Sequence, residues 1–173
     1  MNITVMRQLF DYQVSEFLTN ISQHLPLRRI DGKEDQYLER YYILGRDPGT
    51  FENLKPVMGF LPFTIFLHHF LRPDADLELH NHPWDISYSL ILSGGYTEER
   101  VREENHANIK VWNDLVPGDI NKIAANDFHN IRQLLGDTWT LFVAGKKVQS
   151  WGFLDPMTNT FTKWREFLAR SAR

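Results

Sequence analysis

The sequence has 173 residues, of which 42% are hydrophobic and none is cysteine, and its formal net charge at pH 7 is −3. A chain of this length is typical of one domain around a single core, and the absence of cysteine excludes disulfides, thiolate zinc sites, iron–sulfur clusters and cysteine nucleophiles. Catalytic or metal chemistry must therefore come from the 7 histidines or from carboxylates.

The balance of charge and hydropathy limits the partners. Asp and Glu number 22 against 19 Lys and Arg, which argues against a protein that neutralises a nucleic-acid backbone. The first seven residues do not resemble a secretory signal, and the longest apolar stretch, near residues 57–70, is interrupted by Gly59, Pro62 and Thr64. We expect a soluble cytoplasmic protein with neither a nucleic acid nor a membrane as partner.

The N-terminal segment, residues 7–25, predicts one amphipathic helix. Its apolar residues recur at spacings of three and four, which places them on one face: Phe10, Val14, Phe17, Leu18, Ile21 and Leu25. After Pro26 the pattern changes to short β-prone runs, the first two at residues 36–44 and 60–71.

The remainder of the chain predicts an antiparallel sandwich or barrel. Further β-prone runs are separated by turn residues at short intervals and cover residues 77–82, 86–93, 96–101, 108–112, 119–124, 128–134, 138–144 and 148–153. Residues 162–173 predict a short closing helix. We interpret residues 1–173 as one domain with an N-terminal helical extension to residue 28, a barrel over about 36–153 and this C-terminal helix.

Two histidines are separated by one residue in a predicted strand. His80 and His82 therefore project from the same face, which suits two neighbouring ligands of one metal ion. The alternative is a polar strand end beside the turn at Pro83. A third histidine, His129, follows 47 positions after His82.

At this point the sequence resembles the cupin superfamily, whose barrels carry two motifs. The second motif matches in its spacing, with Gly118 and His129 in place, although Ala124, Asn126 and Gln133 stand where proline, glycine and asparagine are usual. In the first motif His80, His82 and the closing Gly94 fit, whereas Asp74 replaces the opening glycine. The segment from His80 to Asp85, His-Asn-His-Pro-Trp-Asp, also resembles uncharacterised bacterial and phage cupin-like proteins.

The resemblance implies a β-dominated, all-β fold, the double-stranded β-helix or jelly-roll barrel of cupins, with a metal held by His80, His82 and His129. The glutamate of the first motif is missing, because its position falls on Ser87 or, in the shorter variant, on Ile86. The three remaining histidines resemble the ligand set of thiol dioxygenases. A divalent metal is expected, Fe(II) first and Zn, Mn or Ni as alternatives.

Several neighbours of the ligands are candidate site residues. Asp85 is the candidate catalytic or ligand-orienting carboxylate. Strand alternation turns Ser87 and Ser89 toward the interior, and Trp84 could line the mouth of a pocket. Gln133, four residues after His129, should also face inward.

Arginines and the paired histidines complete the candidates. Arg72 is the first candidate for gripping an anionic substrate, with Arg100 and Arg132 as alternatives and a salt bridge at the rim as the simpler interpretation for each. His68 and His69 must point to opposite faces of one strand, and His24 and His106 are expected at the surface.

Three functions are compatible with these features. The first is a metal-dependent, dioxygenase-like enzyme acting on a small polar or carboxylate-bearing molecule. The second is a non-catalytic cupin that binds a small molecule, and the third, a sugar or sugar-phosphate isomerase or epimerase, lacks a well-placed acid and base. A homodimer is the remaining partner hypothesis, since the edge strands of small barrels often pair across a two-fold axis.

Overall fold

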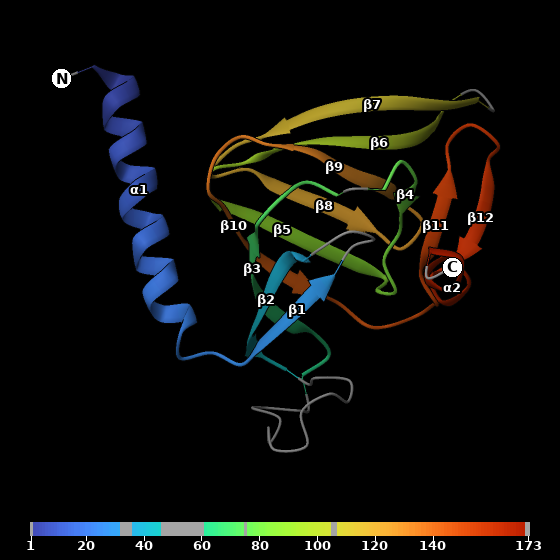
Figure 1. The fold of residues 1–173 in the computed structure, drawn as a ribbon, viewed down its shortest axis with the longest axis horizontal. Coiled ribbons are helices and arrows are strands. Elements are labelled where there is room, and N and C mark those ends of the chain that lie inside the picture. Colours follow the sequence, from blue (N-terminus) through green and yellow to red (C-terminus); the bar gives the residue numbers. More distant parts are fainter. Residues whose placement is uncertain (1, 32–35, 46–60, 75, 105–106, 172–173) are drawn as a thin grey trace.

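The computed structural model describes residues 2–31, 36–45, 61–74, 76–104 and 107–171. Within these residues the chain forms two helices and twelve strands (Figure 1). They are, in chain order, α1 (Ile3–Ser22), β1 (Leu27–Asp31), β2 (Gln36–Leu44), β3 (Thr64–Phe70), β4 (Leu79–His80), β5 (Ile86–Ser93), β6 (Tyr96–Glu104), β7 (Ala107–Leu115), β8 (Ile120–Ala124), β9 (Phe128–Leu134), β10 (Thr138–Ala144), β11 (Gly152–Asp155), β12 (Thr160–Lys163) and α2 (Trp164–Ser171).

The strands form two antiparallel sheets that face each other. One sheet has the order β1-β2-β3-β10-β5-β8 and the other has the order β12-β11-β4-β9-β6-β7. Most neighbours in a sheet are far apart in sequence, as in β3 beside β10 and β4 beside β9, which is the crossing connectivity of a jelly roll. This β-dominated architecture with a helix at each end confirms the predicted fold class.

Period-two alternation sets which side chains enter the barrel. On β5, Ser87, Ser89 and Ile91 are buried toward the second sheet, whereas Tyr88 between them is exposed. On β10 the same alternation places Thr140 and Phe142 inside. The expected inward orientation of the two serines therefore agrees with the structure.

Helix α1 lies outside the barrel and is attached mainly through its second half (Figure 1). Leu18 packs with Tyr41, Leu67 and Trp139, a cluster on the outer face of the first sheet. Ser15 shares a hydrogen bond of 2.9 Å with Ser93 at the end of β5. The C-terminal helix α2 is held at the other sheet by Phe167, which stacks on Phe153 with ring centroids 3.9 Å apart.

Four strands, β2, β5, β9 and β10, have the bounds that the sequence predicts. Strands β1 and β12 were not predicted, since both are short and polar, and the last predicted run begins as a strand only at Gly152. The run predicted over residues 60–71 begins at a residue outside the described part of the chain. Residues 172 and 173, the last two of the predicted closing helix, also lie outside it. No helix in the described part of the chain is long and apolar enough to cross a membrane.

Candidate metal centre

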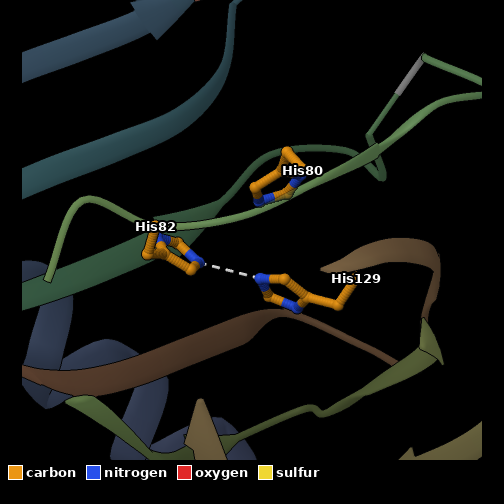
Figure 2. A group of neighbouring side chains, drawn as sticks. All are labelled: His80, His82 and His129. Carbon is orange, nitrogen blue, oxygen red and sulfur yellow. Dashed lines mark hydrogen bonds between the residues drawn. The ribbon is translucent and has the colours of Figure 1, made fainter. Parts of the chain in front are cut away.

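Three histidine rings meet inside the barrel (Figure 2). His80 and His82 come from β4 and the loop after it, and His129 comes from β9. One nitrogen of each ring lies within 4.8 Å of the other two. Among the described residues these are the ones brought together as a potential metal site, so the structure groups the three histidines that the sequence predicts as ligands.

Strand pairing and one asparagine hold the histidines in place. His80 and His129 are direct partners across β4 and β9, which brings their ring centroids to 4.6 Å. Between His80 and His82, the buried side chain of Asn81 links three segments. Its Oδ1 accepts the N–H of Gly152, and its Nδ2 donates to the carbonyl of Ala125. A rigid backbone therefore presents the rings.

The spacing of the ring nitrogens fits a metal ion. Nε2 of His82 lies 2.8 Å from Nε2 of His129. Two imidazole nitrogens that occupy neighbouring positions of one metal at right angles lie about 3 Å apart, given a metal–nitrogen bond of about 2.1 Å. Two acceptor nitrogens at this distance repel each other unless a proton or a cation lies between them.

Burial keeps two of the rings in the form that a metal requires. Loss of solvation, followed by the neighbouring charge of His129, lowers the pKa of His80 and of His82 well below the usual value. Both rings are therefore neutral imidazoles at physiological pH, with a lone pair available. A cation is the charge that such a pair of buried neutral rings accommodates best.

A buried carboxylate orients the third ring. Nδ1 of His129 donates to Oε1 of Glu98 over 2.7 Å, which leaves Nε2 directed at the other two histidines. Glu98 is 0% exposed and also accepts hydrogen bonds from Arg100 and Asn121. Burial alone would raise the pKa of Glu98, but the bond and charge of His129, with those of Arg100, lower it to about 2.

A second carboxylate lies beside His80. Oδ2 of Asp74 is 3.8 Å from Nδ1 of His80 and also accepts the N–H of Ile131. Burial raises the pKa of Asp74 to about 6 against the opposing effects of that bond and of nearby positive charge. Asp74, which replaces the opening glycine of the motif, therefore lies next to the candidate ligand His80. Because Asp74 faces Nδ1, the ring nitrogen of His80 that remains for a metal is Nε2.

A small hydroxyl side chain stands where the motif has its glutamate. Ser87 is 0% exposed on the inner face of β5, and its Oγ has no hydrogen-bond partner among the described residues. Ser89 is buried two residues further along the same face. Neither supplies a carboxylate here, so the three histidines are the ligands that the described residues offer a metal ion, which would keep further positions for other ligands.

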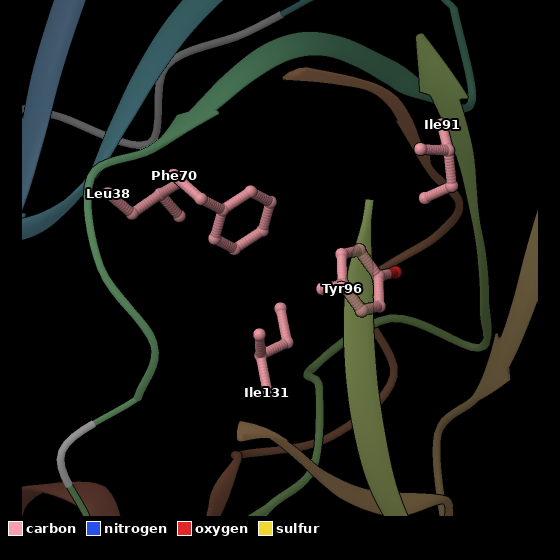
Figure 3. Packing of buried hydrophobic residues seen from close by; sticks show 5 residues of the cluster. All are labelled: Leu38, Phe70, Ile91, Tyr96 and Ile131. Carbon is pink, nitrogen blue, oxygen red and sulfur yellow. The ribbon is translucent and has the colours of Figure 1, made fainter. Parts of the chain in front are cut away.

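Aromatic rings border the histidines on one side, and a packed apolar core fills the barrel on another. Trp84 stacks near His82 with centroids 5.6 Å apart, and Phe142 lies 5.7 Å from the same ring. Figure 3 shows a separate cluster of inward side chains from both sheets, which are Leu38, Phe70, Ile91, Tyr96 and Ile131. The interior therefore contains an apolar cluster apart from the histidines.

The other predicted site residues lie in different surroundings. Asp85 is exposed and its Oδ1 accepts the N–H of Ile86, so its catalytic role stays a prediction. Gln133 is exposed because the register between β6 and β9 shifts by one residue before it. Arg72 donates from Nε to the carbonyl of Gln36. Roles for Gln133 and Arg72 in a pocket likewise remain predictions.

The two alternative arginines are satisfied by the protein itself. Arg100 is buried and donates to Glu98, Asn121 and Asp127. Arg132 donates to Glu99 and to the carbonyls of Asp76 and Leu77. Both therefore form salt bridges, as the simpler interpretation expects, although Arg100 is buried and not at the rim.

The paired histidines behave as strand alternation predicts. His68 is buried inside the barrel, whereas His69 points outward, stacks on Trp139 and contacts Asp137 at 2.8 Å. His24 is exposed as expected, and His106 lies outside the described residues.

Sequence reasoning missed two inward residues, Glu98 and Arg40. It also missed the interaction between Arg40 and His68. Glu98 falls in no motif position. Arg40 alternates with Leu38 and Tyr42 along β2, and this alternation could have been used to place it inside with them.

Comparison with known proteins supports the fold. No protein-family model matches the sequence, and no curated protein matches it. Among solved structures, a single-residue variant of oxalate decarboxylase from Bacillus subtilis is similar with a TM-score of 0.53 at 16% identity, covering 86% of this chain and 32% of that one. The structure of oxalate decarboxylase from Bacillus subtilis at pH 4.6 gives 0.53 at 15% identity, with the same coverage of both chains.

These similarities define the class of fold as that of the cupins. A further oxalate decarboxylase structure has a TM-score of 0.54 at 13% identity. This chain spans about a third of the length of the oxalate decarboxylases it matches. The cupin fold and the cluster of three histidines agree with the sequence motifs, and at this level of identity the likeness concerns the fold alone.

Proposed function

We propose that this protein is a metal-dependent cupin enzyme in which His80, His82 and His129 hold one divalent metal, Fe(II) first, and that its reaction is dioxygenase-like. The substrate would be a small polar or carboxylate-bearing molecule. The observation that carries the proposal is the convergence of three neutral or oriented imidazoles with nitrogens within 4.8 Å, inside a barrel.

The protein's own residues would prepare the site for substrate. Glu98 holds His129 in the orientation that directs Nε2 inward, and Asp74 lies beside Nδ1 of His80. Ser87 and Ser89 leave room on the wall where the cupin motif has a glutamate. Trp84 and Phe142 exclude water from the side of His82.

A divalent metal bound to this triad supplies Lewis-acid chemistry and, if it is Fe(II), one-electron redox chemistry at its open positions. Three neutral ligands leave the full charge of such an ion uncompensated, which favours an anionic co-ligand. A substrate carboxylate meets that requirement.

Metal reconstitution tests the proposal. The metal-free protein is loaded anaerobically with Fe(II), Mn(II), Zn(II) or Ni(II), and bound metal per chain is measured by elemental analysis. Mn(II) is included because oxalate decarboxylase from Bacillus subtilis contains Mn(II) centres. We expect about one ion per chain for the wild type and background levels for His80→Ala, with His24→Ala, an exposed histidine, as the matched control.

Oxygen consumption then tests the activity. The Fe(II)-loaded protein is offered a panel of small carboxylic acids, hydroxy acids and thiols in an oxygen electrode, beside the His80→Ala variant. We expect uptake that depends on both iron and one class of substrate. A protein that binds iron stoichiometrically yet consumes no oxygen and turns over no member of the panel would contradict the enzyme proposal and favour the non-catalytic small-molecule-binding cupin.

A further inference from the structure

One arginine inside the barrel, Arg40, has no anionic partner among the described residues. Arg40 lies on the inner face of β2 between the buried residues Leu38 and Tyr42, and burial lowers the pKa of its guanidinium. A guanidinium nevertheless remains charged in proteins. No carboxylate in the described part of the chain lies within 4 Å of it, in contrast to Arg100 and Arg132.

The contacts of Arg40 hold it in place without neutralising it. Its Nε donates to Nε2 of His68 over 2.9 Å, and its guanidinium carbon lies 4.9 Å from the ring centre of Phe66. Burial and the charge of Arg40 keep the pKa of His68 well below its usual value, so His68 is a neutral acceptor. The hydrogen bond therefore orients the side chain, and no described residue compensates its positive charge.

The bond to His68 also decides which edge of the guanidinium is available. Because Nε is used, the two terminal amino groups remain, and these are the pair that grips a carboxylate with two parallel hydrogen bonds. No hydrogen bond from either terminal group is found among the described residues. An edge of this kind, fixed in an apolar wall, is suited to a single anionic group.

Arg40 lies on the same side of the barrel as the candidate metal centre, with Trp84 near both. Its guanidinium lies 6.0 Å from the ring centre of Trp84, and the same ring lies 5.6 Å from that of His82. In the sheet, Arg40 pairs with His68, which in turn pairs with Thr140, an inward residue whose Oγ1 has no hydrogen-bond partner in the described part of the chain. An uncompensated cation and an unpaired hydroxyl thus lie on one row across the barrel wall, on the side of Trp84.

From this arrangement we infer that Arg40 binds a carboxylate group of the small molecule that occupies the barrel, through its two terminal amino groups, with His68 as its positioning residue. The inference deepens the proposed function and rests on it for the metal. It assigns the anion to Arg40 in place of Arg72, which the sequence favoured.

Carboxylate binding tests the inference directly. Acetate, glycolate, oxalate and malonate are titrated into the metal-loaded protein by calorimetry, with acetamide as the neutral analogue. The variants are Arg40→Met, which keeps the volume but removes the charge, and Arg40→Lys, which keeps the charge but removes the fork. Arg29→Met is the matched control, because the Arg29 side chain on neighbouring β1 is 64% exposed.

We expect at least one carboxylate to bind the wild type, with affinity lowered at least tenfold in Arg40→Met, lowered to a smaller extent in Arg40→Lys, and unchanged in Arg29→Met. Acetamide should not bind. Carboxylate affinity that is unchanged in Arg40→Met, or the absence of binding by every carboxylate to the wild type, would overturn the inference. Metal content measured on the same samples separates this failure from failure of the metal site.

The melting temperature distinguishes a binding role from a structural one, because loss of a purely structural arginine would lower the Tm. A half-buried cation that no described carboxylate compensates opposes folding, so Arg40→Met should melt at or above the wild-type temperature without ligand. Added carboxylate should raise the Tm of the wild type and leave that of Arg40→Met unchanged. A variant that fails to fold or melts several degrees lower would show that Arg40 is structural and would contradict the inference.

Discussion

His129 donates a hydrogen bond of 2.7 Å from Nδ1 to Oε1 of Glu98, a carboxylate that is itself completely buried. The bond fixes the ring so that Nε2 faces the other two histidines. Because Arg100 and Asn121 donate to the same carboxylate, its position is determined by three strands, β6, β8 and β9. The site thus depends on a residue that contributes no ligand atom.

Replacing Glu98 by glutamine should weaken metal binding by about 10–100-fold. Glutamine keeps the shape but loses the negative charge that holds the Nδ1 proton and compensates Arg100. Competition with a chromophoric chelator measures the affinity. The neighbouring variant Glu99→Gln is the matched control, since Glu99 pairs with Lys110 and Arg132 and is not within the histidine cluster. Equal metal affinity in Glu98→Gln and the wild type would contradict the role of Glu98.

Removal of the metal should lower the thermal stability of the wild type. A ligand present at about 1,000 times its dissociation constant stabilises the native state by about 4 kcal/mol. A chelator should therefore shift the Tm of metal-loaded wild type downward by several degrees and leave that of His80→Ala unchanged. Differential scanning calorimetry before and after chelation gives the comparison, and the same shift in both proteins would mean that metal binds elsewhere.

Truncation of Leu67 should show how strongly α1 and the first sheet depend on each other. Leu67 is 1% exposed and packs with Leu18 of α1, Tyr41 and Trp139. We expect Leu67→Ala to lower the free energy of unfolding by about 2–5 kcal/mol, measured by urea denaturation. Leu77→Ala, at a side chain that is 78% exposed, should change it by less than about 0.5 kcal/mol. Comparable effects of both variants would argue against this packing.

Acid should remove a contribution of Glu39. Burial opposes ionisation of this carboxyl, but hydrogen bonds from Tyr41, His69 and Gln36 lower its pKa below the usual 4.5. A carboxyl with a lowered pKa in the native state contributes stability that is complete above the unfolded pKa and is lost as the pH falls through the folded pKa. The contribution should therefore be constant at neutral pH and decline below about pH 4.5.

Unfolding of Glu39→Gln across pH 3–7 measures this contribution. At neutral pH the variant should be less stable than the wild type by on the order of 1–2 kcal/mol, and the difference should shrink on acidification. A difference between the two proteins that stays constant down to pH 3 would rule out the titration of Glu39 as its cause.

Local patterns in the sequence were sufficient to predict the barrel and the cluster of three histidines. The alternation on β5 predicted which serines turn inward, and the spacing of His80, His82 and His129 predicted the cluster. The exposure of the Gln133 side chain was not predictable, because the sequence of one strand does not reveal a register shift between β6 and β9. Arg40, Asp74 and Glu98 acquire their roles only through strands brought together from distant parts of the chain.

The most direct test of the account is a crystal structure of the metal-loaded protein with anomalous diffraction data collected on both sides of the absorption edge of the bound metal. The account predicts a single strong anomalous peak about 2.1 Å from one nitrogen of each of His80, His82 and His129. Histidine rings bonded only to one another, with no anomalous peak between them in crystals grown with Fe(II) or Mn(II), would contradict it.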